Sequence, residues 1–402
     1  MQYFKNAELT KLYNVSFTAV SNWIEAAQKN RLDLQLHQVE DKFYVANTAK
    51  NQALIEEMVQ ERKKYLTTRA LKVVTPSLDF YKRYSREQIL DLISNITVHR
   101  EVPLQFTYFD EGAHHWDRYA RWMLNEKTPN TLRDTIELLE SNIDSIDRLL
   151  QGRKHINVID LGVGNALPIK DLLAHLLKRG TLNRYIAIDI SKEMLSIAEQ
   201  NIKEWFGGAV RFEGYIRDIT SDRFKDLLSD DYLSQDEPLN LVALFGGTLP
   251  NFHSPGDVLR TIYNSMEPGD LFIHALKLDT PDTRRIFDLS EEKTPLNTQF
   301  RLLPDLLNID ESWYDVEQFF DEQDQARTIR IRLKIELSIR FDFGDKKRMV
   351  NFKKGDTITL WRYGHFSATN IISLLAANGF PLLQSSQTSD HTFLLTVCDI
   401  KP

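Results

Sequence analysis

Apolar runs alternate with amphipathic segments in the middle of the chain. Residues 156–159 form an apolar run that ends in Asp160, and residues 185–188 form a second run that ends in Asp189. Between them, leucine and isoleucine recur at helical spacing from residue 169 to residue 177. This order predicts a strand, a helix and a second strand, which is the repeating unit of a doubly wound parallel sheet.

The same alternation continues beyond this unit. Further strands are expected at residues 210–216, 239–245 and 271–276, with a helix at 257–266 before the last of them. A final helix is expected at 367–378, followed by strands at 382–387 and 391–399 that form a closing antiparallel hairpin. Strands that alternate with helices favour a parallel sheet with right-handed crossovers. We therefore expect an α/β fold built on a Rossmann-like sheet of seven strands.

Between the fifth strand and the final helix the hydrophobic period changes to two. Apolar residues occupy every second position through residues 327–343, the pattern of a strand with one buried face. The pair Gly344-Asp345 is a hairpin signal, and strands are expected after it at 346–352 and 357–361. The segment 279–365 is therefore predicted to be an antiparallel-rich insertion.

Residues 1–66 are interpreted as a separate small domain. Short helices are expected at 7–13 and 17–26, a hairpin at 36–39 and 42–45, and a helix at 56–65. The segment AELTKLYNVSFTAVSNWI resembles the helix-turn-helix of winged, MerR-like or excisionase-like DNA-binding domains. Its expected solvent-facing residues are polar but not basic: Ser16, Thr18, Ala19, Ser21 and Asn22. Nine Lys and Arg stand against eight Asp and Glu in residues 1–66, so DNA binding and protein docking or dimerisation both stay open.

Composition restricts the class of protein. A length of 402 residues allows two or three domains, and 42% hydrophobic residues are enough for a sizeable core. The net charge of −7 leaves the whole chain without the basic footprint of a nucleic-acid-binding protein. The single cysteine, Cys398, excludes an internal disulfide and fits a reducing compartment. With no apolar stretch long enough for a membrane span, the chain is expected to be cytoplasmic; its oligomeric state stays open.

The turn after the first strand of the sheet predicts a ligand. Gly162 and Gly164 allow a tight turn against which a ligand can lie, and Asp189 is placed to accept hydrogen bonds from ribose hydroxyls. A dinucleotide fingerprint needs a third glycine where this chain has Leu167. The turn therefore favours S-adenosylmethionine, against the alternative of a merely structural turn. Asp218 could accept a hydrogen bond from the adenine amino group while Ile219 packs against the ring.

An aromatic-rich stretch precedes the sheet. Residues 102–112 lack a clear period and are expected to form an ordered loop. Its aromatic residues and those just after it could cover a pocket or could hold the segment against the core. The adjacent pair His114-His115 lacks a matching acid or cysteine at ligand spacing, so no metal site is expected.

Three motifs together resemble the histidine-specific Nα-methyltransferases of the ergothioneine pathway, a divergent group of class I S-adenosylmethionine-dependent methyltransferases. They are VIDLGVGNA, RYIAIDIS and LFGGTLPNF, and the resemblance covers about residues 100–402. The third motif resembles the family's loop G-S-T-I-G-N-F after the fourth strand. The insertion also resembles the family's extra domain, which closes over an amino-acid substrate.

The resemblance implies roles for individual residues. Asp160, Gly162 and Gly164 would line the methionine tail of the cofactor, Asp189 would bind the ribose, and Asp218 with Ile219 the adenine. Asn251 would bind the α-carboxylate of the substrate. Phe109 falls where the family has its amine-facing tyrosine, with Tyr108 beside it as a possible substitute, and Trp116 falls on a pocket phenylalanine.

The chain departs from the family at the positions that recognise the imidazole ring. A glutamate and a serine of the family are replaced by Trp361 and Tyr363, so no carboxylate is left there to accept the imidazole N–H. Histidine is therefore not the expected substrate. An amine nucleophile must be neutral and its lone pair directed, and Tyr108, Tyr363 and Asn251 are the expected catalytic residues.

These observations predict an S-adenosylmethionine-dependent methyltransferase that N-methylates a small amino-acid-like or amine substrate. The alternative is a ligand-sensing DNA-binding regulator with a catalytically altered methyltransferase domain. The expected division is a helix-turn-helix-like module, a helical linker with an aromatic lid, a methyltransferase core, a substrate-capping insertion and the C-terminal completion of the core: 1–66, 67–120, 121–278, 279–365 and 366–402.

Overall fold

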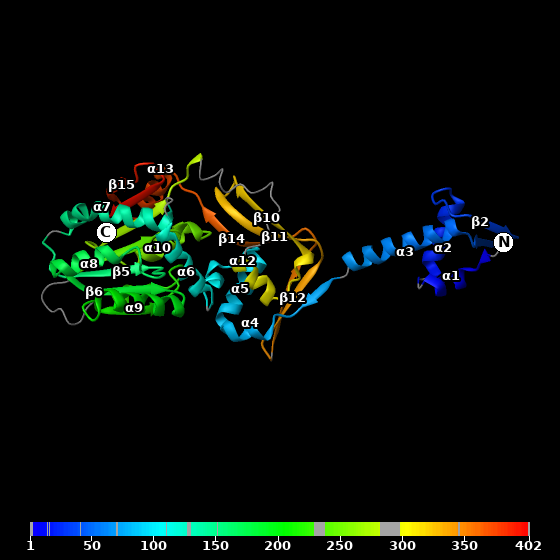
Figure 1. Cartoon of the computed structure of the whole chain (residues 1–402), viewed down its shortest axis with the longest axis horizontal. Helices are drawn as coiled ribbons and strands as arrows, with labels where there is room; N and C mark the ends of the chain where they lie inside the picture. The colour runs from blue at the N-terminus through cyan, green and yellow to red at the C-terminus, as the bar shows by residue number, and fades with distance from the viewer. Residues whose placement is uncertain are drawn as a thin grey trace. The chain divides into compact units, whose positions relative to one another are not determined.

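The computed structural model divides the chain into two compact units (Figure 1). One unit comprises Met1–Val73 with Lys334–Ser338, and the other comprises Val74–Leu333 with Ile339–Pro402. The structure describes residues 3–13, 15, 17–40, 42–69, 71–109, 111–126, 130–150, 152–228, 238–281, 298–344 and 346–400.

The first unit is a small helical domain with a hairpin. Its elements are β1 (Tyr3–Phe4), α1 (Asn6–Tyr13), α2 (Phe17–Gln28), β2 (Leu36–Val39), β3 (Lys42–Ala46) and α3 (Ala49–Arg69). Leu9, Val20 and Ile55 are buried at its centre and come from the three helices. The expected helices and hairpin are present, although α3 starts before residue 56. Whether this unit is a helix-turn-helix module stays a prediction.

One of the side chains that the sequence predicts to face solvent is buried instead. Ala19 is only 3% exposed, because it lies on the face of α2 that packs inward with Val20. Thr18 and Asn22 are exposed, Ser21 is half-buried, and Ser16 lies outside the described residues. The outward face therefore has fewer candidate residues than the sequence indicates.

A seven-stranded sheet forms the centre of the second unit, in the order β15-β16-β9-β8-β5-β6-β7. The strands are β5 (Ile156–Leu161), β6 (Leu182–Asp189), β7 (Phe212–Ile216), β8 (Leu239–Phe245), β9 (Leu271–Lys277), β15 (Leu382–Gln387) and β16 (Phe393–Cys398). Strands β5 to β9 are parallel, and β16 runs antiparallel between β9 and β15. The expected closing hairpin is therefore confirmed.

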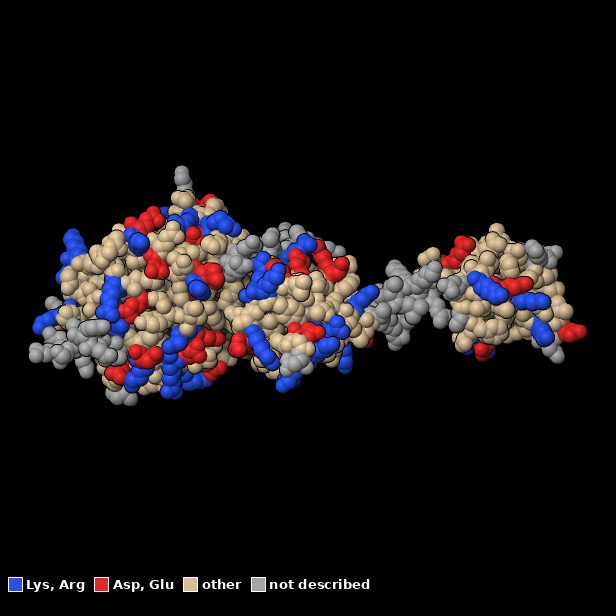
Figure 2. Space-filling view, turned by 90° about the horizontal axis from the view of Figure 1, so that it is seen from below, with Lys and Arg blue, Asp and Glu red and all other residues tan. Residues whose placement is uncertain are grey.

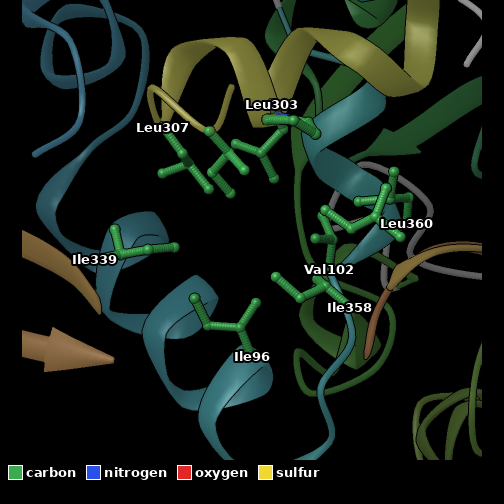
Figure 3. Close-up of a pocket in the computed structure, with 10 residues that line it drawn as sticks. Ile96, Val102, Leu303, Leu307, Ile339, Ile358 and Leu360 are labelled. Atoms are coloured by element: carbon green, nitrogen blue, oxygen red, sulfur yellow. The ribbon is translucent and has the colours of Figure 1, made fainter. Parts of the chain in front are cut away.

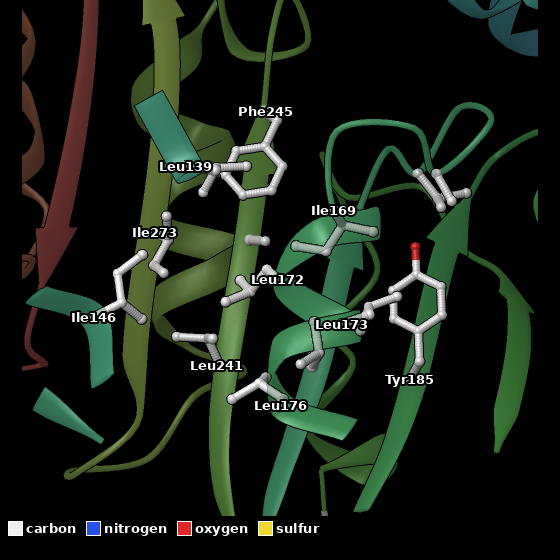
Figure 4. Packing of buried hydrophobic residues seen from close by; sticks show 14 of the residues in the cluster. Leu139, Ile146, Ile169, Leu172, Leu173, Leu176, Tyr185, Leu241, Phe245 and Ile273 are labelled. Carbon is white, nitrogen blue, oxygen red and sulfur yellow. The ribbon is translucent and has the colours of Figure 1, made fainter. Parts of the chain in front are cut away.

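Helices cover both faces of this sheet, which explains why β5 and β8 are buried at every position. On one face lie α7 (Thr131–Leu149), α8 (Lys170–Arg179) and α9 (Lys192–Phe206). On the other lie α10 (Pro255–Tyr263) and α13 (Ala368–Ala377). Figure 4 shows the leucines of α8 packed over Leu241 and Ile273. Each such buried leucine contributes about 1.5–3 kcal/mol of transfer free energy.

Two smaller sheets are ordered β10-β11-β14 and β13-β12-β4, and the insertion supplies every strand of them except β4. Their strands are β4 (Lys72–Val74), β10 (Tyr314–Asp321), β11 (Ala326–Leu333), β12 (Leu337–Asp342), β13 (Lys347–Phe352) and β14 (Thr357–Gly364). The alternating stretch 327–343 is thus two strands rather than one. The β11 ladder ends where Leu333 donates its N–H to Asp356 at 2.9 Å, and β12 then joins a different sheet. Hydrophobic period alone cannot locate such a change of partner.

Two further helices of the second unit precede the core, α4 (Leu78–Arg83) and α5 (Arg86–Val98), and the insertion has a helix of its own, α12 (Thr298–Leu306). The stretch expected to be a loop contains the 3₁₀ turn η1 (Leu104–Thr107), and α6 (Glu111–Asn125) begins within it. Between β7 and β8 the described residues hold the turn η2 (Lys225–Leu227), and 229–237 lie outside the described residues. Within the described part of the chain, no helix has both the length and the apolar composition to cross a bilayer.

Candidate active site

The turn after β5 has the geometry that its glycines predict. Gly162 has φ +65° and Gly164 has φ +55°, a region that side chains disfavour. A Cβ on Gly162 would lie 3.0 Å from Cγ2 of Thr248, in the loop after β8. A Cβ on Gly164 would meet nothing within 4 Å. The first glycine therefore allows the two loops to approach each other, and the second lies beside open space.

Asp189 ends β6 next to this turn. Its carboxylate accepts hydrogen bonds from the N–H of Gly164 at 3.3 Å and from the N–H of Ser191 at 2.9 Å. Burial nevertheless raises its pKa to about 6, because these amides offset only part of the desolvation. The carboxylate is thus fixed by backbone at the carboxyl edge of the sheet, where ligands of α/β folds bind.

Asp160 is buried near the end of the neighbouring strand, β5. The hydroxyl of Tyr185 donates to its carboxylate at 2.8 Å. Burial raises the pKa of Asp160 to about 7; the hydrogen bond from Tyr185 lowers it and the charge of Asp189 raises it further. Asp160 is therefore engaged by a side chain of β6.

The two residues expected at the adenine lie in the loop after β7. Asp218 accepts hydrogen bonds from the N–H of Thr220 at 2.9 Å and from its hydroxyl at 2.6 Å, so one carboxylate oxygen stabilises its own turn. Ile219 is 7% exposed and packs in the core beneath the sheet.

Two apolar residues at this edge were not among those expected from the sequence. Ile190 and Ile216 line a cavity of about 510 Å³ together with Phe109, and Ile216 is 53% exposed. Both could be predicted from the sequence, because Ile190 directly follows Asp189 and Ile216 ends β7, the strand that pairs with β6 at Asp189. An exposed isoleucine at the carboxyl end of a strand is a candidate for packing against a ligand ring.

Helix α6 is attached to the glycine turn by side-chain hydrogen bonds. Asn165 Nδ2 donates to Asp117 at 2.9 Å, and Arg121 donates to the side-chain oxygen of Asn201 on α9 at 2.8 Å. Asn201 in turn donates to the carbonyl oxygen of Asn165 at 2.9 Å. The helix that carries the expected lid residues therefore has a defined position over the turn.

Tyr108 and Trp116 stack on each other, with ring centroids 5.3 Å apart. Burial raises the pKa of Tyr108 above its usual range, and the charges of Asp189 and then Tyr363 add to this. Charges from the carboxyl edge of the sheet, at Asp189, and from the insertion, at Tyr363, thus both act on Tyr108. Phe109 packs instead against Tyr84, at 5.9 Å between ring centroids.

Asn251 and Tyr363 meet over Gly247, in the loop that follows β8. A Cβ on Gly247 would lie 3.2 Å from Cε2 of Tyr363 and 3.6 Å from Nδ2 of Asn251. The side-chain oxygen of Asn251 is buried, and no donor among the described residues reaches it. A buried acceptor without a donor is costly, so this oxygen marks a place for a ligand N–H or O–H.

Trp361 stacks on Tyr363 on the same face of β14, with ring centroids 5.9 Å apart. Burial raises the pKa of Tyr363 to about 12, while the nearby charge of Arg327 lowers it. The structure therefore places Tyr108, Asn251, Trp361 and Tyr363 around one region of the second unit.

Two other features do not add to this site. A small cavity of about 10 Å³ lies between α5 and the insertion and is lined only by apolar residues, among them Ile96, Leu303 and Ile339 (Figure 3). A space of this size holds no more than a water molecule. In the described ranges, no three His, Cys, Asp or Glu side chains gather as a metal ion would require.

The family model described as "Histidine-specific methyltransferase, SAM-dependent" matches residues 85–400. The chain belongs to this family. It is therefore an S-adenosylmethionine-dependent methyltransferase. S-adenosylmethionine is its cofactor, and the open space at Gly164 beside the carboxylate of Asp189 fits that group.

Solved methyltransferase structures are similar to this methyltransferase at low identity. An S-adenosylmethionine-dependent methyltransferase from Clostridium acetobutylicum is 13% identical, with 73% of this chain and 98% of that chain covered and a TM-score of 0.39. Magnesium protoporphyrin IX methyltransferase from Synechocystis, with bound SAH, is 10% identical, with 78% and 100% covered and a TM-score of 0.38. Human N-acetylserotonin methyltransferase is 13% identical, with 100% and 88% covered and a TM-score of 0.37. Comparison with curated proteins gave no match.

Proposed function

We propose that this methyltransferase N-methylates a small amino-acid-like or amine acceptor other than histidine. One observation carries the proposal: Trp361 and Tyr363 form a stacked pair where the resemblance expects the carboxylate and hydroxyl that recognise imidazole. A pocket that lacks the acceptor for the imidazole N–H loses its selectivity for that ring.

The cofactor would lie at the carboxyl edge of the sheet. Gly162 and Gly164 would line its methionine tail with Asp160 nearby, and Asp189 would accept from the ribose hydroxyls. Asp218, with Ile219 below it, would mark the adenine end, where Ile190 and Ile216 offer apolar contacts. When bound, S-adenosylmethionine supplies an electrophilic methyl group on a positively charged sulfur.

The chain's own residues would hold the acceptor nitrogen. The resemblance assigns Asn251 to the α-carboxylate, which only its Nδ2 could bind; its side-chain oxygen would accept one N–H of the adjacent amine, which directs the nitrogen lone pair away from Asn251. The hydroxyls of Tyr108 and Tyr363 are protonated at neutral pH, because the ordinary pKa of a tyrosine is already 10 and burial raises the pKa of both further. Neither phenol is thus a base for an ammonium group, and the amine must reach the site neutral. Positioning and exclusion of water would supply most of the rate enhancement.

The first experiment is calorimetric titration of the full chain with S-adenosylmethionine, beside Asp189→Ala. We expect binding by the wild type and loss of binding in the variant. Screening amines and amino acids for methyl transfer follows. Absence of wild-type binding at millimolar cofactor would contradict the proposal.

A double variant tests the acceptor end of the pocket. Trp361→Glu with Tyr363→Ser restores the residues that the resemblance places against an imidazole, so histidine turnover should rise at least tenfold above the wild type. Trp313→Glu in the turn η4 (Glu311–Trp313) is the matched control and should not gain histidine turnover. If the wild type itself prefers histidine, the proposal is wrong.

No observation favours the alternative of a DNA-binding regulator. On α2 the exposed positions include Phe17, which is 58% exposed, and Glu25, which pairs with Lys29. Figure 2 shows Lys and Arg interspersed with Asp and Glu on the face viewed, rather than gathered in one basic patch. DNA contact through residues 1–66, the cytoplasmic location and the five-part domain division therefore remain predictions.

A further inference from the structure

A buried arginine lies against the aromatic pair of the acceptor pocket. Arg327 is on β11, directly opposite Tyr363 on β14, and is 8% exposed. The central carbon of its guanidinium lies 4.9 Å from the ring centroid of Tyr363 and 5.6 Å from that of Trp361. A cation is therefore held at the two positions where this chain departs from the residues that recognise an imidazole.

The position of this arginine is set by a histidine. Arg327 Nε donates to Nε2 of His365 at 2.9 Å, and Nδ1 of His365 lies 3.1 Å from a carboxylate oxygen of Asp279. His365 can accept from Arg327 only when its proton is on Nδ1, facing Asp279. The carboxylate of Asp279 is thus separated from the guanidinium by an imidazole ring. This arrangement orients the guanidinium through its Nε atom, and the Nη groups are the part that binds carboxylates in a fork.

A second cation lies close to the first. Lys277 ends β9 at the carboxyl edge of the sheet; burial lowers its pKa, and the charge of Arg327 lowers it further. Asp134 and Asp390 act on Lys277 in the opposite direction. Lys277 and Arg327 therefore act on each other, and it is Arg327 that lies against Tyr363, whose ring also reaches Asn251 over Gly247.

We propose that Arg327 binds an anionic group at the side-chain end of the acceptor, so that the acceptor is an amino acid with an acidic side chain. The inference rests on the proposed function. Asn251 holds the amine end and Arg327 the far end, with the ring of Tyr363 between them. A carboxylate at the far end would be recognised by a preformed guanidinium, whereas the isosteric amide would lack the charge.

The test compares methyl transfer to L-glutamate and L-aspartate with transfer to L-glutamine and L-asparagine, at saturating S-adenosylmethionine. The full-length protein should favour an acid over its amide by about 100-fold in kcat/KM. Arg327→Met should reduce this ratio to less than about tenfold while leaving the Kd for S-adenosylmethionine unchanged. Arg330→Met is the matched control on the same strand, where Arg330 pairs with Glu317, and should keep the ratio.

Arg327→Lys keeps the positive charge but lacks the paired N–H groups of the guanidinium. It also controls for a folding defect in Arg327→Met. It should retain part of the preference, because an ammonium still attracts the carboxylate. An unchanged ratio in Arg327→Met, or equal use of acids and amides by the wild type, would overturn the inference.

Binding separates this inference from the proposed function. If S-adenosylmethionine binds, but the protein does not methylate glutamate or aspartate with it and the SAH-loaded protein does not bind either acid by calorimetry, the inference fails and the methyltransferase assignment stands. If the amides are methylated faster than the acids, the N-methyltransferase proposal is supported and the role of Arg327 is refuted.

Discussion

His274 lies in the middle of β9, and its ring stacks on that of Phe272 at 6.1 Å between centroids. Both ring nitrogens are buried, and neither has a hydrogen-bond partner among the described residues. Burial lowers its pKa to about 3, since a charged imidazole would lose its water. The side chain therefore behaves as a neutral ring in an apolar layer, at the cost of its unmade hydrogen bonds.

Replacing this ring should stabilise the fold. His274→Leu removes two buried polar atoms, so the free energy of unfolding should rise by about 1–3 kcal/mol at pH 7. Between pH 6.5 and 3 the unfolded wild type binds a proton that the folded state excludes, so its stability falls as the pH falls; the variant should lose less. Denaturant midpoints at pH 7 and pH 4.5 measure both effects. His115→Leu, at an exposed position of α6, is the control. A midpoint for His274→Leu below that of the wild type would contradict the argument.

At the same scale, the proposed contact of Asp189 with the ribose predicts that cofactor binding depends on pH. Its carboxyl has a raised pKa of about 6 and must be ionised to accept from two ribose hydroxyls. The Kd for S-adenosylmethionine should be constant above pH 7 and rise below pH 6, by up to about tenfold per pH unit. Calorimetry from pH 5 to 8 measures this.

A neighbouring carboxyl supplies the control for that profile. Asp160 has a pKa raised to about 7, and Asp160→Asn keeps an acceptor for the hydroxyl of Tyr185. The step near pH 6 should persist in Asp160→Asn and vanish in Asp189→Asn. If the step disappears only in Asp160→Asn, the pH dependence comes from Asp160 and its assignment to Asp189 is wrong.

Among the elements, α6 connects the sheet to the proposed acceptor site. Its second residue, Gly112, is buried, and a Cβ there would lie 2.2 Å from the carbonyl oxygen of Thr107. The close approach holds η1 against the start of α6 and so places Tyr108 next to Trp116. A glycine is required here for close packing rather than for a positive φ.

Gly112→Ala should therefore disturb the lid. The added methyl group must displace backbone, so we expect a loss of about 1–3 kcal/mol in stability. Tyr108 should move with the displaced turn, and the acceptor KM should rise. Gly208→Ala is the control, because a Cβ there would meet nothing within 4 Å. Equal melting temperatures for the two variants would rule out the close contact.

At the scale of the whole molecule, the two units should respond separately to the cofactor product. All the expected cofactor ligands belong to the second unit. SAH at 100 times its Kd should stabilise that unit by about 2.7 kcal/mol and leave the first unit unchanged. Differential scanning calorimetry should show two transitions, of which one moves with SAH. A single transition that moves as a whole would show that the units unfold together.

Local patterns in the sequence determined much of the sheet and of its carboxyl edge, where the cofactor is proposed to lie. Strand, turn and helix alternate at short range, so the positions of Gly162, Gly164 and Asp189 follow from neighbouring residues. Positive φ at both glycines and an acid at a strand end are local properties. The closing hairpin was also predictable, because both of its strands have their own apolar runs.

Only the tertiary structure decided what gathers at the acceptor pocket. Tyr363 reaches Asn251 over Gly247, and Arg327 lies opposite Tyr363 through the register of β11 and β14. The change of sheet after Leu333 and the placement of Tyr108 in the pocket also depend on partners distant in sequence. A hydrophobic period tells which face of a strand is buried, but the register between strands is set by packing of the whole fold.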